Sequence, residues 1–282
     1  MSTKAKNHIM LSSNDLKKLQ RIELEMLIEV DRICRKHDIR YSLDGGTLLG
    51  AVRHHGFIPW DDDIDVVMLR PEYEKFRAAC EVELDKTRFF LQDYRSDPYY
   101  IFGYEKLRRE NTAFVRIGQE QLKQHGGIFI DIFVYDHVPN NRLLRSLHLF
   151  ACFCIRKVLY SEIGKISAPT SWLRGWYTLI NRIPRNFVFK FRNAIANVCN
   201  RKKTKLCRHY THHYRKECRY GLPRICFDDY IELDFEEYRF KAFKNYDYYL
   251  SELYGNYMEL PPAENRASHL EVSDIKFVEP KF

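Results

Sequence analysis

The apolar positions near the N-terminus change from helical spacing to short continuous runs. Over residues 14–36 they recur every three or four positions, which predicts an amphipathic helix with one face packed against a sheet. Short apolar runs then predict strands over 40–43 and 63–69. Between them, a Gly-Gly pair indicates a turn, and the segment 47–54 has the pattern of a short helix that Gly56 ends.

The rest of the chain continues this mixture of helices and strands. Further strands are expected over 88–94, 99–106, 113–117, 128–134 and 238–243, and further helices over 72–84, 142–160, 172–183, 187–220 and 247–254. We expect an α+β fold in which helices flank a mixed β-sheet, with a basic and mostly helical insert. The first part of the core would occupy 1–140, the insert 141–226, and the return to the core with a C-terminal tail 227–282.

Charge is distributed unevenly along the chain. Residues 141–226 contain 19 Lys or Arg against two acids, Glu162 and Glu217, a net charge of +17, whereas the whole chain carries only +8. Such asymmetry indicates a basic surface that meets something anionic. One interpretation is attachment to an anionic membrane surface through Trp172, Trp176, Phe187, Phe189 and their neighbouring cations. The alternative is an ordinary helical subdomain; nucleic acid is disfavoured because no recognised binding module accompanies the charge.

The cysteines and the N-terminus indicate a cytoplasmic setting. No signal peptide or bilayer-length apolar segment is evident, and eight cysteines without a secretory signal favour reduced thiols. We therefore expect a cytoplasmic protein that can be peripheral at the membrane. A zinc site is an open alternative, because histidines lie between four cysteines that nevertheless lack hairpin spacing. These cysteines are Cys199, Cys207, Cys218 and Cys226.

The strongest chemical signal is a run of four carboxylates, Asp61, Asp62, Asp63 and Asp65, directly before an apolar run. In a strand over 63–69, Asp63 and Asp65 point to the same face. Their repulsion favours a hard cation between them, for which Mg²⁺ is the first choice and Mn²⁺ the alternative. A solvated acidic turn is the competing interpretation.

Asp131 is isolated within the apolar strand expected over 128–134. Burying a carboxylate there is costly without partners. We interpret Asp131 as a third metal carboxylate, which strand pairing brings beside Asp63 and Asp65. A water-facing position on an edge strand is the alternative.

A phosphate site is expected where the Gly-Gly pair meets the following helix. Gly45, Gly46 and Thr47 lie between a strand and a helix, where backbone N–H groups can bind phosphate.

Three stretches together resemble one protein family. They are G-G-T-L-L-G-A-V-R-H-H-G-F-I-P-W-D-D-D-I-D-V from Gly45, G-G-I-F-I-D-I-F at 126–133, and Y-G-N-Y-M-E-L-P-P with Arg266 and His269 after it. They resemble the LicD family of phosphocholine transferases, a branch of the nucleotidyltransferase-fold superfamily, over about residues 15–140 and 230–270. The superfamily pattern is Gly-Gly or Gly-Ser, Asp-x-Asp on a strand and a later carboxylate. The long gap between Gly46 and Asp63 departs from that pattern but is similar to the LicD branch.

The resemblance implies a nucleotidyltransferase-like sheet and assigns further residues to substrate. Asp63, Asp65 and Asp131 would be both catalytic and metal-binding. Cations and aromatics in or near the matching stretches would contact phosphate or acceptor, and a trimethylammonium group would favour an aromatic cage. The substrate-binding candidates are Arg53, His54, Trp60, Lys106, Arg266 and His269, and the cage candidates are Trp60, Phe102 and Tyr104.

The expected function is Mg²⁺-dependent transfer of phosphocholine, or a related phospho-alcohol, from a CDP-linked donor such as CDP-choline. The acceptor would be a hydroxyl of a cell-surface glycan, such as lipopolysaccharide or teichoic acid, on a lipid carrier. One alternative is a glycosyltransferase in which Asp63 and Asp65 bind a sugar nucleotide through the metal. Another is a basic binding module with an inactive core. The transferred alcohol, the acceptor sugar, the number of metal ions and the oligomeric state stay open.

Overall fold

The computed structural model describes residues 9–212, 214, 218, 220–266 and 271–282. The helices of that part are α1 (Ser13–Lys36), α2 (Gly45–His54), α3 (Arg70–Glu83), α4 (Arg142–Ser167), α5 (Ser171–Ile180), α6 (Arg185–Cys199) and α7 (Tyr246–Tyr254). The strands are β1 (Ile9–Met10), β2 (Ser42–Leu43), β3 (Asp65–Leu69), β4 (Phe89–Gln92), β5 (Glu105–Arg109), β6 (Ala113–Arg116), β7 (Phe129–Val138), β8 (Leu206–Arg208), β9 (Leu222–Pro223), β10 (Tyr230–Phe235), β11 (Tyr238–Phe243) and β12 (Glu271–Lys276).

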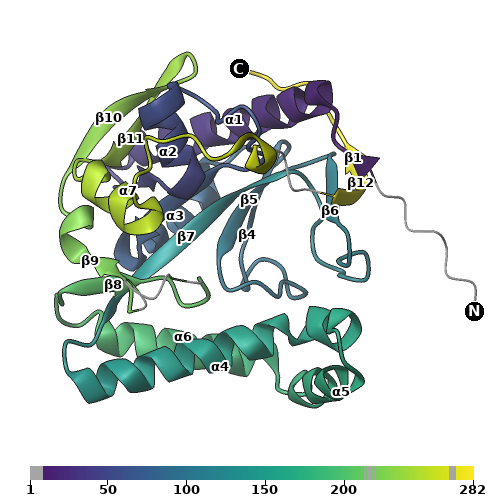
Figure 1. The fold of residues 1–282 in the computed structure, drawn as a ribbon, viewed down its shortest axis with the longest axis vertical. Coiled ribbons are helices and arrows are strands. Elements are labelled where there is room, and N and C mark those ends of the chain that lie inside the picture. The colour runs from purple at the N-terminus through teal and green to yellow at the C-terminus, as the bar shows by residue number, and fades with distance from the viewer. Residues whose placement is uncertain (1–8, 213, 215–217, 219, 267–270) are drawn as a thin grey trace, which may run out of the picture.

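A mixed sheet forms the centre of the molecule (Figure 1). Its strands run in the order β2-β3-β7-β5-β4, and β8 and β9 extend it from the far end of β7. β3 and β7 are parallel, whereas the other neighbouring pairs are antiparallel. Smaller sheets, β1-β12-β6 and the β10-β11 hairpin, lie beside it. The expected mixed sheet with flanking helices is confirmed.

The long β7 organises the core because one face of its first six residues is apolar. Ile130, Ile132 and Val134 are buried there, and α1 packs against β7 and β5 with Met26 and Val30 fully buried. Burying each such side chain contributes about 1.5–3 kcal/mol. The opposite face of β7 carries Phe129, Asp131 and Phe133, since alternate residues of a strand point to opposite faces.

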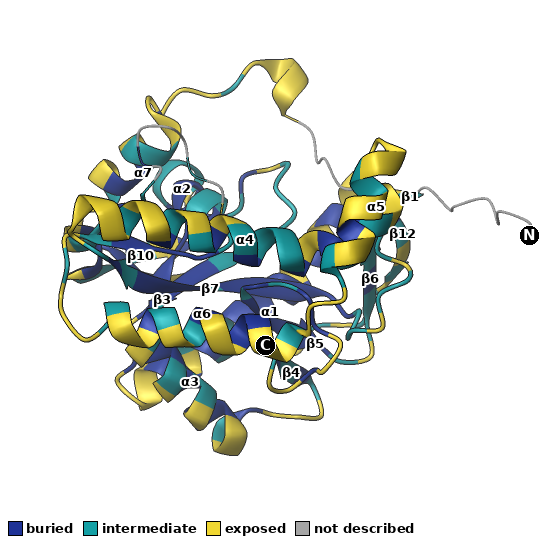
Figure 2. Cartoon of the chain, turned by 90° about the horizontal axis from the view of Figure 1, so that it is seen from below, coloured by how far each residue is buried: buried dark blue, intermediate teal, exposed yellow. Residues whose placement is uncertain are grey.

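Three helices, α4, α5 and α6, form a layer below the sheet, and Figure 2 shows them from beneath. None of the described helices combines the length and apolarity needed to cross a membrane.

The helix expected over 187–220 is wrong, because α6 ends at Cys199. Asn200 is the reason. Its amide nitrogen donates to Asp136 on β7 at 2.6 Å, and its amide oxygen accepts from the His137 backbone at 2.8 Å. These contacts hold the chain against β7, so that Leu206–Arg208 adds to the sheet as β8 instead of continuing the helix.

The strand expected over 99–106 is also wrong, because β5 begins at Glu105. The preceding residues form a loop closed by its own polar groups: the Tyr100 backbone donates to Asp97 at 3.0 Å, and the Tyr100 hydroxyl donates to the Tyr104 carbonyl at 2.7 Å. This loop carries Phe102 and Tyr104, two of the residues expected to form the aromatic cage.

The turn expected at the Gly-Gly pair is the first turn of α2. Asp44 is the N-cap, and its carboxylate accepts from the Gly45 backbone at 2.8 Å. The strand expected from residue 63 starts at Asp65, so Asp63 lies in the loop before β3.

Arg70 is predicted to be essential for stability. Its guanidinium donates to both carboxylate oxygens of buried Asp136 at 2.9 and 2.6 Å, joining α3 to β7. Burial opposes the charge of Asp136, but Arg70 brings the pKa of that carboxyl below its usual value. Arg70→Met leaves the buried carboxylate without its cation, and we expect it to lower the free energy of unfolding by about 3–5 kcal/mol. Denaturant unfolding measures this.

The matched control is Arg77→Met on the same helix, whose partner Glu81 is largely exposed. We expect a loss of about 1 kcal/mol or less there. Equal losses in the two variants would contradict the structural role given to the buried pair.

Candidate active site

A row of polar side chains crosses the central sheet. Asp65 on β3 pairs directly with Asp131 on β7, Asp131 with Lys106 on β5, and Lys106 with Gln92 on β4. Directly paired residues have their Cβ atoms about 5 Å apart on one face of a sheet. The structure thus places Asp131 beside Asp65, where strand pairing was expected to bring it. The metal-binding role of the two residues stays a prediction.

The other carboxylates of the acidic run gather just before β3. Asp61, Asp62 and Asp63 each offer one oxygen, and these three oxygens lie within 4.8 Å of one another. Asp131 is placed differently, because the Lys106 ammonium is hydrogen-bonded to one of its oxygens. The acidic group therefore has two parts, the loop 61–63 and the neighbouring pair on β3 and β7.

Burial and mutual repulsion hold these carboxyls away from their normal ionisation. Burial first, and then Asp63 and Asp62, raise the pKa of Asp61 to about 7. Burial, followed by Asp63 and Asp131, raises the pKa of Asp65 well above its usual value. Within the described part of the chain, Oδ1 of Asp65 is buried without a hydrogen-bond partner. A divalent cation would relieve both the repulsion and this missing partner, so the residues present fit one.

Glu23 is a carboxylate that the sequence interpretation missed. It lies on the buried face of α1, and one of its oxygens has no hydrogen-bond partner among the described residues. Burial, and then Asp63 and Asp62, raise its pKa well above the ordinary value. The available signal was its place within an apolar helical face, seven residues after Leu16 and four after Leu19.

Close contacts with two carboxylates explain why both residues of the Gly-Gly pair are glycine. A Cβ at Gly46 would lie 2.6 Å from Oδ2 of Asp61, and one at Gly45, whose φ is +48°, would lie 3.3 Å from Oδ2 of Asp65. Only glycine lets the first turn of α2 approach the carboxylates this closely. The Thr47 hydroxyl accepts from the Asp65 backbone at 2.8 Å and so positions the start of β3. Phosphate binding by these three residues stays a prediction.

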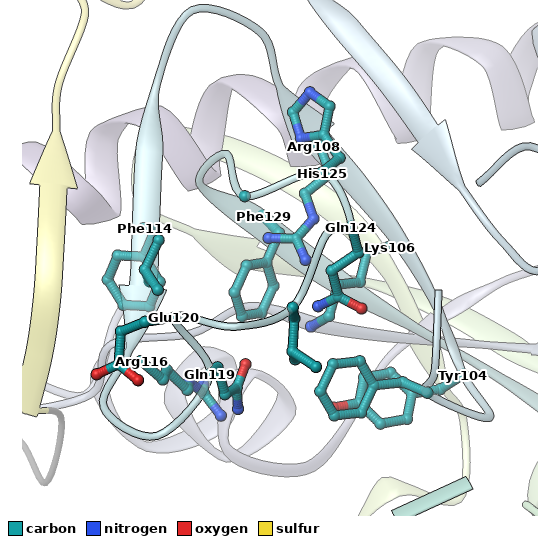
Figure 3. Close-up of a pocket in the computed structure, with 14 residues that line it drawn as sticks. Tyr104, Lys106, Arg108, Phe114, Arg116, Gln119, Glu120, Gln124, His125 and Phe129 are labelled. Carbon is teal, nitrogen blue, oxygen red and sulfur yellow. The ribbon is translucent and has the colours of Figure 1, made fainter. Parts of the chain in front are cut away.

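Beside the carboxylates is a cavity of about 130 Å³ with a cationic wall (Figure 3). Three cations surround the ring of Phe129: Nζ of Lys106 lies 3.2 Å from the ring centre, and the guanidinium carbons of Arg108 and Arg116 lie 4.6 and 5.5 Å from it. Nε of Arg116 is buried and has no hydrogen-bond partner in the described part of the chain. Arg116 was not among the sequence candidates, because one arginine at the end of a short strand carries no distinctive pattern.

Lys106, expected to bind substrate, is one of these three cations. Burial lowers its pKa to about 7, although Asp131 partly offsets that effect, and Arg108 and Arg116 lower it further. An anion that enters the cavity would favour the charged form of Lys106.

The aromatic residues expected to form one cage are divided between two places. Phe102 and Tyr104 line the cationic cavity, and Nζ of Lys106 already lies 5.9 and 4.9 Å from their ring centres. Trp60 instead lines a groove of about 440 Å³ next to α2 and α7. A choline group in contact with Phe102 and Tyr104 would therefore lie beside Lys106, where like charges repel.

Of the other expected residues, Arg53 lines the groove, and His54 and Arg266 lie near Trp60. Arg53 donates to the backbone carbonyls of Tyr257 and Glu259 at 2.7 and 3.1 Å, and so joins α2 to the segment after α7. His54 meets Trp60 edge-on, with ring centres 6.2 Å apart, and the Arg266 guanidinium lies 6.0 Å from the Trp60 ring centre. His269 lies outside the described residues.

Tyr254 connects the groove to the carboxylates. It lines the groove, and its hydroxyl would lie 3.5 Å from a Cβ built at Gly45. Burial, then Asp44 and Asp65, raise its pKa. The carboxylates thus have a neighbour in each cavity: Lys106 lines the cationic cavity, and Tyr254 lines the groove.

The zinc alternative receives no support among the described residues. Their one group of three or more Asp, Glu, His or Cys side chains with closely spaced ligand atoms is Asp61, Asp62 and Asp63. His213, one of the histidines between the four cysteines, lies outside the described residues.

Comparison with known proteins identifies the family. Residues 38–150 match the model described as LicD/FKTN/FKRP, nucleotidyltransferase domain. Over 269 residues, the chain is 29% identical to the lipopolysaccharide cholinephosphotransferase LicD of Haemophilus influenzae, covering 90% of this chain and 95% of that protein. The chain carries a LicD-family domain. A shorter match, 61% identical over 28 residues, is to the human ribitol 5-phosphate transferase FKRP and covers 10% of this chain and 6% of that protein.

The resemblance that the sequence motifs indicated is therefore confirmed. The family match includes the Gly-Gly pair, the acidic run, Lys106, Arg116 and Asp131, and so spans both the carboxylates and the cationic wall. Family membership supports a transferase, and the finer assignments are proposals made below.

Asp61 provides a pH test of the buried acidic group. A raised folded-state pKa stabilises the fold below the unfolded value near 3.8, and this contribution is lost as the pH rises through about 7. With divalent ions chelated, we expect Asp61→Asn to raise the Tm at pH 8 by roughly 2–4 °C, the shift that ~1 kcal/mol gives in a large domain. At pH 5 we expect a smaller increase, because Asp61 is still protonated in the fold and only its ionisation in the unfolded chain opposes folding. Scanning calorimetry measures both values.

The control is Asp274→Asn, which changes an exposed aspartate on β12. It should leave the Tm unchanged at both pH values. A Tm for Asp61→Asn equal to that of the wild type at pH 8 would show that repulsion within the acidic group is negligible.

Proposed function

We propose that this protein transfers a phospho-alcohol, with phosphocholine as the first candidate, from a CDP-linked donor to a hydroxyl of a glycan. One observation carries the proposal: Asp65 and Asp131 lie side by side, Lys106 beside Asp131 lines a cationic cavity, and Tyr254 near Asp65 lines a separate groove. A transferase needs two substrates to meet at one reacting centre, and this arrangement offers a place for each. The Haemophilus influenzae relative is named for cholinephosphate transfer to lipopolysaccharide, which supports the choice of substrates.

Asp63, Asp65 and Asp131 would hold Mg²⁺, or Mn²⁺ in its place. The buried, unpartnered oxygen of Asp65 and the repulsion among the carboxyls support this assignment. When bound, the ion would neutralise negative charge that develops on the donor phosphates. Its binding requires the carboxyls to lose their protons, so affinity should rise with pH.

The cationic cavity fits the donor's phosphates. Lys106, Arg108 and Arg116 surround it, and the buried Nε of Arg116 is available to donate a hydrogen bond. Charge-assisted hydrogen bonds of this kind bind phosphate in proteins. The groove beside Trp60, Arg53 and Arg266 would then receive the acceptor glycan.

The transfer itself requires positioning and charge stabilisation more than covalent chemistry by the protein. The acceptor oxygen forms a bond to the phosphorus that carries the alcohol, and the bond from that phosphorus to the bridging oxygen breaks. CMP leaves with the bond's electrons, while the hydroxyl proton passes to Asp131. Lys106, hydrogen-bonded to Asp131, holds this carboxylate in place and balances its charge.

The acceptor is proposed to be lipid-linked, so that the enzyme works at the cytoplasmic face of a membrane. The basic segment 141–226 supports that location. Ribitol phosphate is a second candidate for the transferred group, since a short segment is 61% identical to the human ribitol 5-phosphate transferase FKRP. A glycosyltransferase using UDP-sugars is disfavoured by the family match.

Asp65→Asn is expected to reduce CMP release from CDP-choline by about 100-fold or more, because the buried charge facing the reacting phosphate is removed. The assay follows CMP with Mg²⁺ present, in parallel with CDP-ribitol, CDP-ethanolamine and a UDP-sugar. Mn²⁺ binding, followed by electron paramagnetic resonance, should weaken in the same variant.

Asp274→Asn again serves as the exposed control and should retain wild-type CMP release and Mn²⁺ binding. Undiminished CMP release by Asp65→Asn would refute the assigned role. Turnover of the UDP-sugar alone would replace the proposal with the glycosyltransferase alternative.

Arg116→Gln tests the donor cavity. Losing one charge-assisted contact to phosphate should raise the KM for the CDP donor roughly 10-fold or more and leave the KM for the acceptor unchanged. Initial rates at varied donor and acceptor concentrations separate the two constants. Arg239→Gln, an exposed arginine of β11, is the matched control. If Arg116→Gln changed only the KM for the acceptor, the donor phosphates would have to bind outside the cationic cavity.

A further inference from the structure

The helical layer beneath the sheet has apolar side chains on its outward face as well as on its buried face. On α4, Leu143, Leu147, Phe150 and Phe153 recur at helical spacing and are exposed, with Phe150 64% exposed. The opposite face of α4, with Cys152 and Ile155, is buried. A surface helix normally has a polar outer face, so this second apolar stripe is unusual.

α5 and α6 repeat the arrangement. On α5, Trp172, Trp176 and Leu179 form the exposed stripe, and Trp172 is 74% exposed. On α6, Phe187 and Phe191 are exposed on the side away from the buried face, with Phe187 63% exposed. In Figure 2, which views the molecule from below, these three helices lie toward the viewer. Exposed apolar side chains on three helices of one layer are typical of an interaction site.

The charge of these helices indicates what covers them. Residues 142–199 contain ten Lys or Arg and one acid, Glu162, and that acid is bound by Lys165 and Arg185 at 2.8 Å each. Arg182 and Lys190 are exposed next to the apolar stripes. Tryptophan and phenylalanine flanked by cations are typical of surfaces that lie in the headgroup region of an anionic membrane.

We propose that the outward face of α4, α5 and α6 is a docking surface for an anionic membrane. The apolar stripes enter the headgroup region, and the surrounding cations contact anionic lipid. A second copy of the chain fits this face poorly, because two strongly basic layers would face each other. The surface goes beyond the transfer reaction, since lipid binding requires neither donor nor metal.

The same layer supports the candidate active site from its buried side. Arg192 of α6 donates to the Gly103 carbonyl at 2.8 Å, in the loop that carries Phe102 and Tyr104. Phe189 of α6, which was expected at the membrane surface, is instead buried and stacks on Tyr94, with ring centres 4.6 Å apart. A membrane bound to the outward face would therefore hold the cationic cavity close to the lipid surface.

The test is flotation of the purified chain with vesicles of phosphatidylcholine alone or mixed equally with phosphatidylglycerol, with a chelator and without donor. We expect binding to the anionic vesicles that weakens as salt is added. The double variant Trp172→Ser/Phe187→Ser should lower the vesicle partition coefficient by about tenfold or more. Arg182→Glu/Lys190→Glu should weaken binding to anionic vesicles specifically.

Val82→Ser/Tyr248→Ser removes two exposed apolar side chains from other helices and should bind as the wild type does. Asp65→Asn should also float normally, so failure of the transfer reaction and failure of docking are distinguishable. No flotation of the wild type with anionic vesicles would overturn the proposal. So would unchanged binding by Trp172→Ser/Phe187→Ser, or a wild-type dimer in light scattering that this variant dissociates.

Discussion

The structure depends on keeping several carboxylates close together in a poorly solvated place. Asp65 and Asp131 are neighbours on parallel strands, and the loop 61–63 brings further acids beside them. Charges of one sign repel strongly where water is excluded, so such a group is stable only if it is protonated or neutralised by a cation. Lys106 supplies part of that neutralisation through Asp131. The remaining repulsion is what a divalent ion, as proposed above, would neutralise.

The surrounding elements hold the carboxylates close together and place positive charge beside them. The two glycines of α2 allow its first turn to reach Asp61 and Asp65, and Thr47 fixes the start of β3. On the other side, Arg108 and Arg116 provide a positive wall that the acids alone would lack. Buried like charges reduce stability, which the large apolar core around β7 and α1 offsets. The local loss of stability is thus consistent with the proposed binding of a cation and of phosphate at this site.

The helical layer connects the site with the outside of the molecule. Its buried face supports the loop of Phe102 and Tyr104, while its outward face carries apolar stripes and a strong positive charge. An enzyme whose acceptor is attached to lipid gains from such an arrangement. An enzyme bound to the membrane that carries its acceptor would meet that acceptor at a higher effective concentration than an enzyme free in solution.

The sequence by itself predicted most helices and strands of the core, among them α1 and β7, because the spacing of apolar residues is a local property. It also identified the candidate carboxylates, because Asp63 and Asp65 belong to an acidic run directly before an apolar strand and Asp131 lies within one. Tertiary structure alone decided the rest. The contacts of Asn200 with β7 end α6 early, and strand register places Lys106 beside Asp131. Glu23 and Arg116 belong to the site only because distant segments meet there, a relation that depends on packing and that no local pattern encodes.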